Sequence, residues 1–239
     1  TIGEFERIVI DSVNRGGKML VPTFAVGRAQ LITLLLGKMF RAGRVQPFPI
    51  FLDSPMAIEA TNIYAKHPEL FDDEMTALIR DHPLREDLKT MKLTPTADES
   101  RAINDVHGAC LIMAGAGMCN GGRILHHLKA NLWKPSTHVL IVGYQAQGSL
   151  GRLLVDGAKE VKIFGEKIAV KATIHTLGGF SAHAGQTDLM HWFDVIAPSK
   201  PRVVLTHGED DQRAALAQVI QQRDGLSAKL PKMGEVIEL

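Results

Sequence analysis

Residues 2–13 carry apolar side chains at the spacing of a helix, which has about 3.6 residues per turn. The apolar positions that share one side of this helix are Ile2, Phe5, Ile8, Val9 and Val13. Gly16-Gly17 then interrupt the pattern, because glycine disfavours helix continuation. The chain is therefore expected to open with an amphipathic helix.

Four times along the chain, a short apolar run typical of a buried strand is followed by a loop of small residues and then by a helical pattern. The strand segments are Met19–Val21, Pro49–Leu52, Ala109–Met113 and Val139–Val142, and the helices are expected from Gly27, Met56, Gly122 and Ser149. Alternating strands and helices favour a parallel sheet covered by helices. The sequence predicts an α/β fold with αβα layers.

Other segments depart from this alternation. Residues 70–100 are charged and broken by Pro83 and Pro95, so we expect an insertion or lid rather than core.

A β-hairpin is expected around Gly165-Glu166, which is flanked by the segments Val161–Phe164 and Lys167–Ile174. This pattern predicts antiparallel strands added to the sheet. After a Gly-rich loop at 178–185, the pattern predicts a helix around Leu189, a strand at 202–206, a helix at 211–223 and short strands at 228–232 and 235–239.

Composition narrows the class of protein. The 239 residues are 45% hydrophobic and 22% charged, which is typical of a globular chain. The sequence contains no apolar run of about 18 residues and no secretory signal pattern at its start, so we expect a cytoplasmic protein without a membrane partner. Because the formal net charge is only +1, any site for a polyanion must come from cations gathered locally.

The four loops that follow the predicted parallel strands are expected at one edge of the sheet, where open α/β sheets bind ligands. Free backbone N–H groups at the helix starts favour an anion such as phosphate, and nearby arginines can add charged contacts. The candidate phosphate-binding residues are Arg28, Ser54, Gly115, Gly117, Arg123, Tyr144 and Gln147, with Arg152 just beyond the fourth loop. The alternative is that these glycines serve only the turns and the arginines only the solvated surface.

Most of the ten histidines have no partner at the spacing of metal ligands. We expect His67, His82, His107 and His138 to lie at the surface. His126 and His127 are adjacent on a helix and cannot share a face. His183 and His207 differ, because each lies in a loop after a predicted strand beside small residues that allow a ligand to approach.

Several active-site signatures are missing from the sequence. It contains no HxHxDH, HExxH or cysteine-pair motif, so these residues are not expected to assemble a zinc site by themselves. It also contains no GxSxG and no GxxxxGK[ST] segment, which argues against serine hydrolases and P-loop proteins.

Six segments together resemble a known family, in order and in spacing. They are KMLVPTFAVGRAQ (residues 18–30), PIFLDSPMA (49–57), AGAGMCNGGRILHHL (114–128), GYQAQG (143–148), LGGFSAHAG (177–185) and VVLTHGE (203–209). This set resembles the β-CASP metallo-β-lactamase nucleases, and most of all the bacterial and archaeal RNA-processing branch related to the nuclease subunit of the cleavage and polyadenylation factor. Ribonuclease J is a more distant resemblance.

The resemblance implies a domain division and roles for three residues. Residues 1–176 would form the β-CASP domain and residues 177–239 the C-terminal part of the metallo-β-lactamase domain, with the N-terminal part absent. His207 would be a ligand of one of two zinc ions in the full-length protein. His183 would protonate the leaving oxygen of the scissile phosphate, and Ser181 would contact that phosphate.

The resemblance also implies what these residues do not supply. The family's HxHxDH signature and its other acidic ligands precede the β-CASP insertion, so we expect the isolated chain to be inactive and to retain no zinc. Family members that act on DNA tend to lack a histidine at the position of His207, which favours RNA.

The sequence therefore predicts part of a zinc-dependent ribonuclease that binds single-stranded RNA. It does not decide between a monomer and a homodimer. Two other hypotheses compete with this one. The first is a non-catalytic α/β module that binds nucleic acid or phosphate through the same loops. The second is a small-molecule α/β enzyme, for which the sequence shows no cofactor fingerprint.

Overall fold

The computed structural model describes residues 1–80, 82–181 and 183–238. The chain divides into two compact units, Thr1–Ser181 and Ala182–Leu239. Each unit has its own buried apolar cluster and is described separately.

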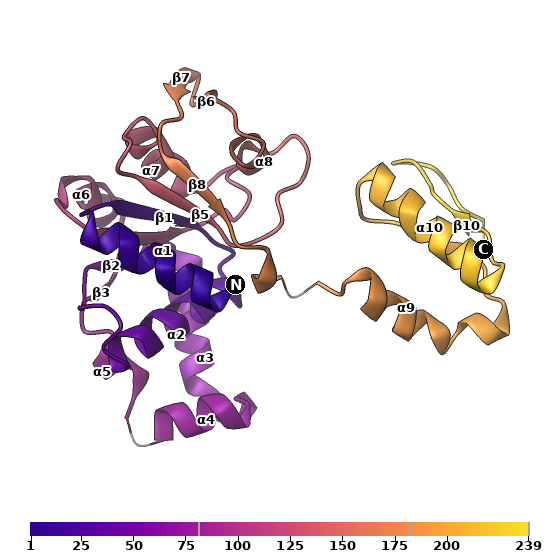
Figure 1. Ribbon diagram of the computed structural model, residues 1–239, viewed down its shortest axis with the longest axis horizontal. Helices are drawn as coiled ribbons and strands as arrows, with labels where there is room; N and C mark the ends of the chain where they lie inside the picture. Colours follow the sequence, from indigo (N-terminus) through magenta and orange to yellow (C-terminus); the bar gives the residue numbers. More distant parts are fainter. Residues whose placement is uncertain (81, 182, 239) are drawn as a thin grey trace. The chain divides into compact units, whose positions relative to one another are not determined.

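The centre of the first unit is a six-stranded sheet in the order β3-β2-β4-β1-β5-β8 (Figure 1). Every pair of neighbouring strands in this sheet is parallel. The strands are β1 (Lys18–Pro22), β2 (Ile50–Leu52), β3 (Met91–Leu93), β4 (Cys110–Ala114), β5 (His138–Ile141) and β8 (Thr173–Thr176). The parallel α/β fold expected from the four strand-helix repeats is confirmed.

Helices cover both faces of this sheet. The helices of the first unit are α1 (Ile2–Asn14), α2 (Arg28–Arg41), α3 (Pro55–Lys66), α4 (Asp73–Arg80), α5 (Leu84–Asp87), α6 (Ala97–Ala102), α7 (Ile124–Asn131) and α8 (Leu150–Val155). Successive strand side chains point to opposite faces, so Met19 and Val21 pack with α1 and α2 whereas Leu20 packs with α7 and α8. The result is the αβα layering that the sequence predicts.

Residues 70–100 are more than an insertion, and this part of the prediction was wrong. Met91–Leu93 forms the edge strand β3, which pairs in parallel with β2. Leu88 is buried in the core, and Thr94 and Ser100 are buried beyond the strand. The strand is only three residues long and lies among charged residues, so its pattern was too short to recognise.

The predicted hairpin is present, but its place in the fold differs from the expectation. β6 (Glu160–Ile163) and β7 (Glu166–Ala169) pair antiparallel in a two-stranded sheet of their own. The segment expected as one strand, Lys167–Ile174, is divided between β7 and β8, and β8 joins the main sheet in parallel with β5. Residues 170–172 carry no glycine or proline, so the sequence gives no sign of this division.

The second unit contains a βαβ arrangement. Its elements are α9 (Gln186–Asp194), β9 (Val203–Val204), α10 (Asp210–Asp224) and β10 (Ala228–Lys229), and β9 and β10 pair in parallel. The strand expected at 235–239 is not found over 235–238, where Val236 is 84% exposed and has no sheet to pack on. Its last residue, Leu239, lies outside the described residues.

Among the described residues, none of the helices combines the length and the apolar character that crossing a bilayer requires.

Candidate functional site

The four loops singled out in the sequence meet at one edge of the sheet. They follow β1, β2, β4 and β5, which are contiguous in the order β2-β4-β1-β5. Because these strands are parallel, their carboxyl ends lie on the same side, and we call the loops at residues 23–27, 53–54, 115–123 and 142–149 the four-loop edge. The expectation that the sheet brings them together is confirmed.

Hydrogen bonds lock these loops to one another. The amide of Thr23 donates to the carbonyl of Ala114 at 3.0 Å. The side chain of Gln145, which the sequence did not single out, is buried and donates from Nε2 to the carbonyl of Gly117 at 2.9 Å. The amide of Leu150 donates to Oδ1 of Asn120 at 3.1 Å. The edge is therefore a preorganised surface, which lowers the entropy lost on ligand binding.

The two glycines predicted to contact phosphate are held differently. A Cβ atom on Gly117 would lie 2.8 Å from ring carbons of Phe24, so only glycine fits without moving the ring. A Cβ atom on Gly115 would meet the carbonyl oxygen of Thr23 at 3.8 Å and Oγ of Ser54 at 3.9 Å, which is ordinary contact. Close packing therefore explains Gly117 but leaves Gly115 without a structural requirement for glycine.

Arg28 is the first residue of α2 and lies at this edge. Among the described residues, nothing accepts a hydrogen bond from its Nε or Nη1 atom, although both are shielded from solvent. Burial lowers the pKa of this guanidinium. Its Cζ lies 5.9 Å from the centroid of the Phe180 ring. Two N–H groups that are shielded from water and have no acceptor among the described residues are suited to an incoming anion.

The remaining polar candidates on the edge lie at or near helix starts. Ser54 caps α3, and its Oγ accepts from the amide of Ala57 at 3.3 Å. Tyr144 is 48% exposed, and Gln147 is also exposed. Arg152 lies within α8 and pairs with Asp156 at 2.9 Å, which favours a structural role for it.

Arg123 is engaged with the protein. Its Nη1 donates to Oδ1 of Asp53 at 2.8 Å and to the carbonyl of Thr94 at 2.5 Å, and its Nη2 donates to the carbonyl of Pro95 at 2.8 Å. Its side chain is 22% exposed. These bonds tie the loop before α7 to the segment after β3, so Arg123 supports the edge whether or not it also reaches a phosphate.

Asp53 is the centre of this buried network, and the sequence did not single it out. Its side chain is fully buried and accepts from four side chains. The donors are Thr94 at 2.8 Å, Ser100 at 2.6 Å, Arg123 at 2.8 Å and His127 at 2.7 Å. Burial alone would raise the pKa of Asp53, but these hydrogen bonds outweigh it and lower the pKa to about 2. Asp53 is therefore ionised at neutral pH.

The histidines show one wrong prediction and several correct ones. His67, His82 and His107 are exposed as expected. His138 is buried in β5, where its Nδ1 lies 3.0 Å from Nε2 of His175. The sequence placed it at the surface because polar residues precede it. His126 is exposed and His127 buried, in agreement with the expectation that they cannot share a face.

The residues expected to carry chemistry lie near the end of the first unit and in the second. Ser181 follows a short 3-10 turn, Gly178–Phe180, and is exposed. His183 and His207 are exposed in loops of the second unit. His207 has a left-handed backbone with φ of 55°, and its Nδ1 lies 3.5 Å from Oγ1 of Thr206. Across the residues that the structure describes, no three His, Cys, Asp or Glu side chains come together as metal ligands.

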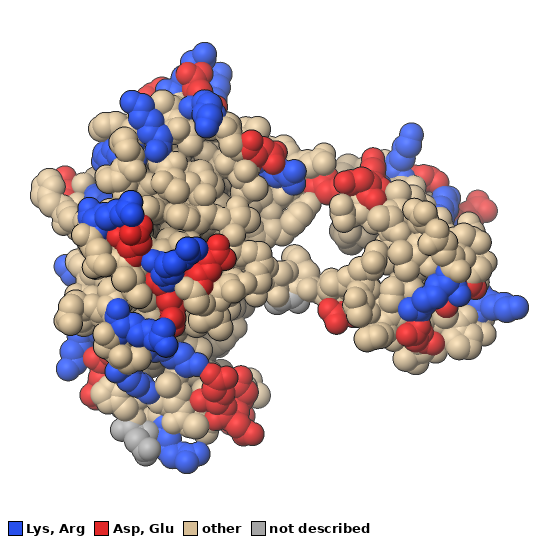
Figure 2. Space-filling view, in the orientation of Figure 1, with Lys and Arg blue, Asp and Glu red and all other residues tan. Residues whose placement is uncertain are grey.

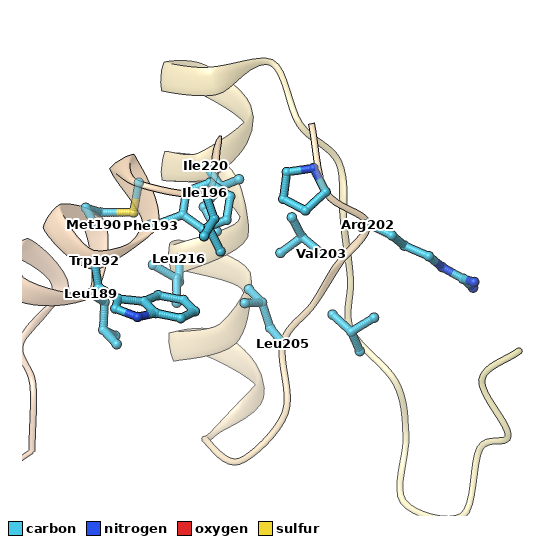
Figure 3. Close-up of a pocket in the computed structure, with 12 residues that line it drawn as sticks. Leu189, Met190, Trp192, Phe193, Ile196, Arg202, Val203, Leu205, Leu216 and Ile220 are labelled. Atoms are coloured by element: carbon cyan, nitrogen blue, oxygen red, sulfur yellow. The ribbon is translucent and has the colours of Figure 1, made fainter. Parts of the chain in front are cut away.

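A cavity of about 230 Å³ in the second unit does not contain these histidines (Figure 3). It lies between α9, β9 and α10, and Figure 3 shows Trp192, Phe193, Leu205 and Leu216 around it. Its lining is apolar apart from Arg202, whose side chain extends away from the other labelled residues. The cavity lacks the converging polar groups of a reaction site.

Comparison with known proteins agrees with this architecture. Residues 29–154 match the family model described as the Beta-Casp domain. Residues 167–231 match the model described as a Zn-dependent metallo-hydrolase RNA specificity domain. The chain belongs to the β-CASP metallo-β-lactamase family of RNA nucleases.

Individual relatives include bacterial and archaeal proteins. The chain is 40% identical to a ribonuclease of Thermus thermophilus over 98% of this chain and 53% of the relative. It is 32% identical to the transcription termination factor FttA of Pyrococcus horikoshii over 97% of this chain and 36% of the relative. An RNase J-like protein of Methanocaldococcus jannaschii is 31% identical over 97% of this chain and 52% of the relative. The chain thus spans about half or less of the length of these relatives.

Proposed function

We propose that this chain supplies the RNA-binding surface of a metal-dependent ribonuclease, together with two of its active-site histidines. Arg28 carries the proposal, because it begins α2 at the four-loop edge and its buried Nε and Nη1 atoms have no acceptor among the described residues. The family assignment and the relatives named as ribonucleases support RNA as the polyanion. The proposed substrate is single-stranded, and its unpaired backbone would lie across the four-loop edge.

The proposed RNA contacts lie in the loops of the four-loop edge, at the first residue of α2 or in the loop after Phe180. They are Arg28, Ser54, Gly115, Gly117, Arg123, Tyr144, Gln147 and Ser181. Backbone N–H groups at the helix starts would hold phosphate oxygens, and Arg28 would add a charge-assisted hydrogen bond. Arg123 would act mainly by holding the loop before α7, because three of its hydrogen bonds go to the protein.

Zinc is the proposed metal, with two ions in the full-length protein. Zinc sites use three or four protein ligands, and the described residues do not bring three candidate ligands together, so they do not fit a complete site. We assign His207 as one ligand of a site that other residues of the full-length protein complete. The isolated chain should therefore retain no zinc and hydrolyse no RNA, and metal analysis of the purified chain tests this.

His183 is proposed to protonate the leaving group. When the P–O bond to the departing ribose oxygen breaks, the imidazolium would transfer its proton to that oxygen. In the full-length protein, His183→Ala should lower kcat about 10²-fold to 10⁴-fold with zinc retained. Unchanged turnover with retained zinc would exclude this role.

The competing hypothesis is a nucleic-acid-binding module without catalysis, which the lack of a ligand cluster in the described residues favours. The two hypotheses differ in one measurement. A full-length protein that binds RNA tightly, carries zinc and still leaves the RNA intact would support the binding module. The domain boundary at residues 176 and 177, a homodimer and a cytoplasmic location stay predictions.

A further inference from the structure

The β6–β7 hairpin is fixed onto α7 by its inner side. Val161 and Ile163 of β6 are 4% and 2% exposed and belong to the same core cluster as Leu128 of α7. Lys129 of α7 pairs with Glu166 of β7 at 2.6 Å. The hairpin is therefore a rigid part of the first unit, and its outer side faces solvent.

The turn of this hairpin places a large aromatic residue where the backbone disfavours one. Phe164 and Gly165 have φ of 50° and 83°, which is the backbone of a type I′ turn. Asn, Asp or Gly normally occupies the first of these positions, because a bulky side chain is strained there. The ring of Phe164 is nevertheless 54% exposed and rests on His126, with ring centroids 4.7 Å apart. Neither the turn nor the core requires phenylalanine.

The outer side of the hairpin also places two cations opposite each other. Lys162 pairs directly with Lys167 across the antiparallel strands, and both are exposed. Like charges at such positions are destabilising. Glu160 forms an ion pair with Lys167 at 3.1 Å, and Lys162 has no ion pair with any of the described residues. Figure 2 shows basic side chains over this hairpin, at the top of the view, with acidic side chains among them.

The far end of α7 adds a second exposed aromatic ring with cations around it. Trp133 is 51% exposed, and Nζ of Lys134 lies 5.2 Å from its ring centroid. The amide of Lys171 donates to the carbonyl of Leu132 at 2.8 Å, which brings this exposed lysine next to Trp133. Aromatic rings among cations are the means by which proteins bind single-stranded nucleic acid.

We propose that these residues form a second contact surface for single-stranded RNA, outside the four-loop edge. The hairpin surface consists of Trp133, Lys134, Lys162, Phe164, Lys167 and Lys171. Bases would stack on Phe164 and Trp133, while the lysines would hold the phosphates between them. An anion between Lys162 and Lys167 would also relieve their repulsion.

The position of α7 connects this surface to the four-loop edge. The helix begins directly after the loop at 115–123 and extends for eight residues, which is about 12 Å. RNA held at the four-loop edge can therefore continue along α7 to the hairpin surface. The proposal rests on the proposed function in this respect, and it predicts that longer RNA binds more tightly than RNA that reaches only the edge.

Phe164→Asn separates binding from stability, because asparagine suits the turn but offers no ring. In the full-length protein, Phe164→Asn should raise the melting temperature. It should also weaken binding of a long single-stranded RNA about tenfold, the loss expected for one stacked base. Binding of a short RNA that spans only the four-loop edge should not change. Fluorescence anisotropy with labelled RNA and thermal unfolding measure these quantities.

Lys162→Thr tests the charged part of the surface, since threonine is favourable in a strand and removes the like-charge pair. For long RNA, the slope of log K against log salt concentration should become smaller in magnitude by about 0.7. The matched control is Lys92→Thr, at an exposed position in the edge strand β3, and it should leave the slope unchanged.

The hairpin proposal fails if Phe164→Asn and Lys162→Thr leave long-RNA affinity and its salt slope at the parent values. It also fails if polyglutamate of equal charge displaces long RNA as well as unlabelled RNA does, because the surface would then suit an acidic protein. Arg28→Ala, measured in parallel, reports on the four-loop edge. If the hairpin variants bind long RNA like the parent while Arg28→Ala binds it more weakly, only the second surface is overturned. If the hairpin variants bind long RNA more weakly while Arg28→Ala matches the parent, only the four-loop edge is overturned.

Discussion

Asp53 is a carboxylate without solvent contact, and four side chains from separate segments satisfy it. Arg123 belongs to the loop after β4, whereas Thr94 follows β3. The network thus joins neighbouring parts of the sheet edge through one charge. Removing one partner of a buried ionic network costs far more than removing an exposed pair.

Asp53→Asn should lower the free energy of unfolding by about 2 to 4 kcal/mol, because the amide would turn hydrogens toward existing donors and leave Arg123 uncompensated. The folded-state pKa of about 2 lies below the ordinary value of 3.8, so the stability from Asp53 is present above about pH 4 and lost as pH falls toward 2. Urea unfolding at several pH values measures both effects. The free energy of unfolding of the variant should fall less steeply than that of the parent as pH decreases below about 4.

Asp98→Asn is the matched control, because the side chain of Asp98 is 90% exposed. It should leave the unfolding midpoint close to that of the parent. Equal effects of the two substitutions would contradict the special role of Asp53.

Single residues were predictable where local pattern decides their environment. Arg28, Ser54 and Gly117 follow predicted strands, and the sheet order brings their loops together. The Asp53 network was not predictable, since His127 and Asp53 are separated by 74 positions and neither has a distinctive neighbour. His138 was misplaced because burial in β5 depends on the addition of β8 beside it.

At the scale of elements, repeated patterns were reliable and isolated short strands were not. The four strand-helix units all formed the expected parallel sheet. β3 was missed because it is only three residues long. β8 was expected as part of an antiparallel strand added to the sheet, whereas it pairs with β5 in parallel and follows the hairpin without a helix between them. Long-range pairing decides the place of such strands, and no local signal reports it.

The loop at 115–123 provides a test of packing at the edge. A Cβ atom on Gly117 would press on the ring of Phe24 at 2.8 Å, but this ring is 46% exposed and can rotate. Gly117→Ala should therefore destabilise the protein by only about 1 kcal/mol while it displaces Phe24 and weakens RNA binding. In the same loop, a Cβ atom on Gly121 would meet nothing within 4 Å, so Gly121→Ala should change neither quantity. Similar RNA affinities for the two variants would rule out a role for the Phe24 packing.

The contact between β5 and β8 contains the paired rings of His138 and His175. Burial lowers the pKa of both histidines, and in His175 the neighbouring His138 lowers it further. As pH falls below the unfolded value of about 6.5, the unfolded chain takes up protons first, so the free energy of unfolding decreases. The double variant His138→Gln and His175→Gln should make this decrease shallower between about pH 7 and 5.

Chemical unfolding at several pH values measures that slope. His67→Gln, at an exposed position after α3, is the matched control and should keep the slope of the parent. A double variant with the parent's slope would show that the pair does not contribute to the pH dependence.

At the scale of the whole molecule, the proposed RNA-binding surfaces and the proposed catalytic histidines belong to different compact units. The four-loop edge and the hairpin surface lie in Thr1–Ser181, whereas His183 and His207 lie in the second unit. The chain spans 53% of its Thermus thermophilus relative. The described residues thus support the proposed RNA binding more fully than the proposed cleavage.

The salt dependence of RNA binding by Arg28→Ala tests the central claim most directly. The matched control is Arg85→Ala, because Arg85 is exposed on α5. The helix α5 packs on the C-terminal half of α2 near Gly37, so Arg85 lies away from Arg28 at the start of α2. Loss of one phosphate contact should weaken binding of single-stranded RNA by the full-length protein and reduce the slope of log K against log salt by about 0.7. Arg85→Ala should match the parent. An Arg28→Ala protein with the parent's affinity and slope would contradict the proposed RNA-binding surface.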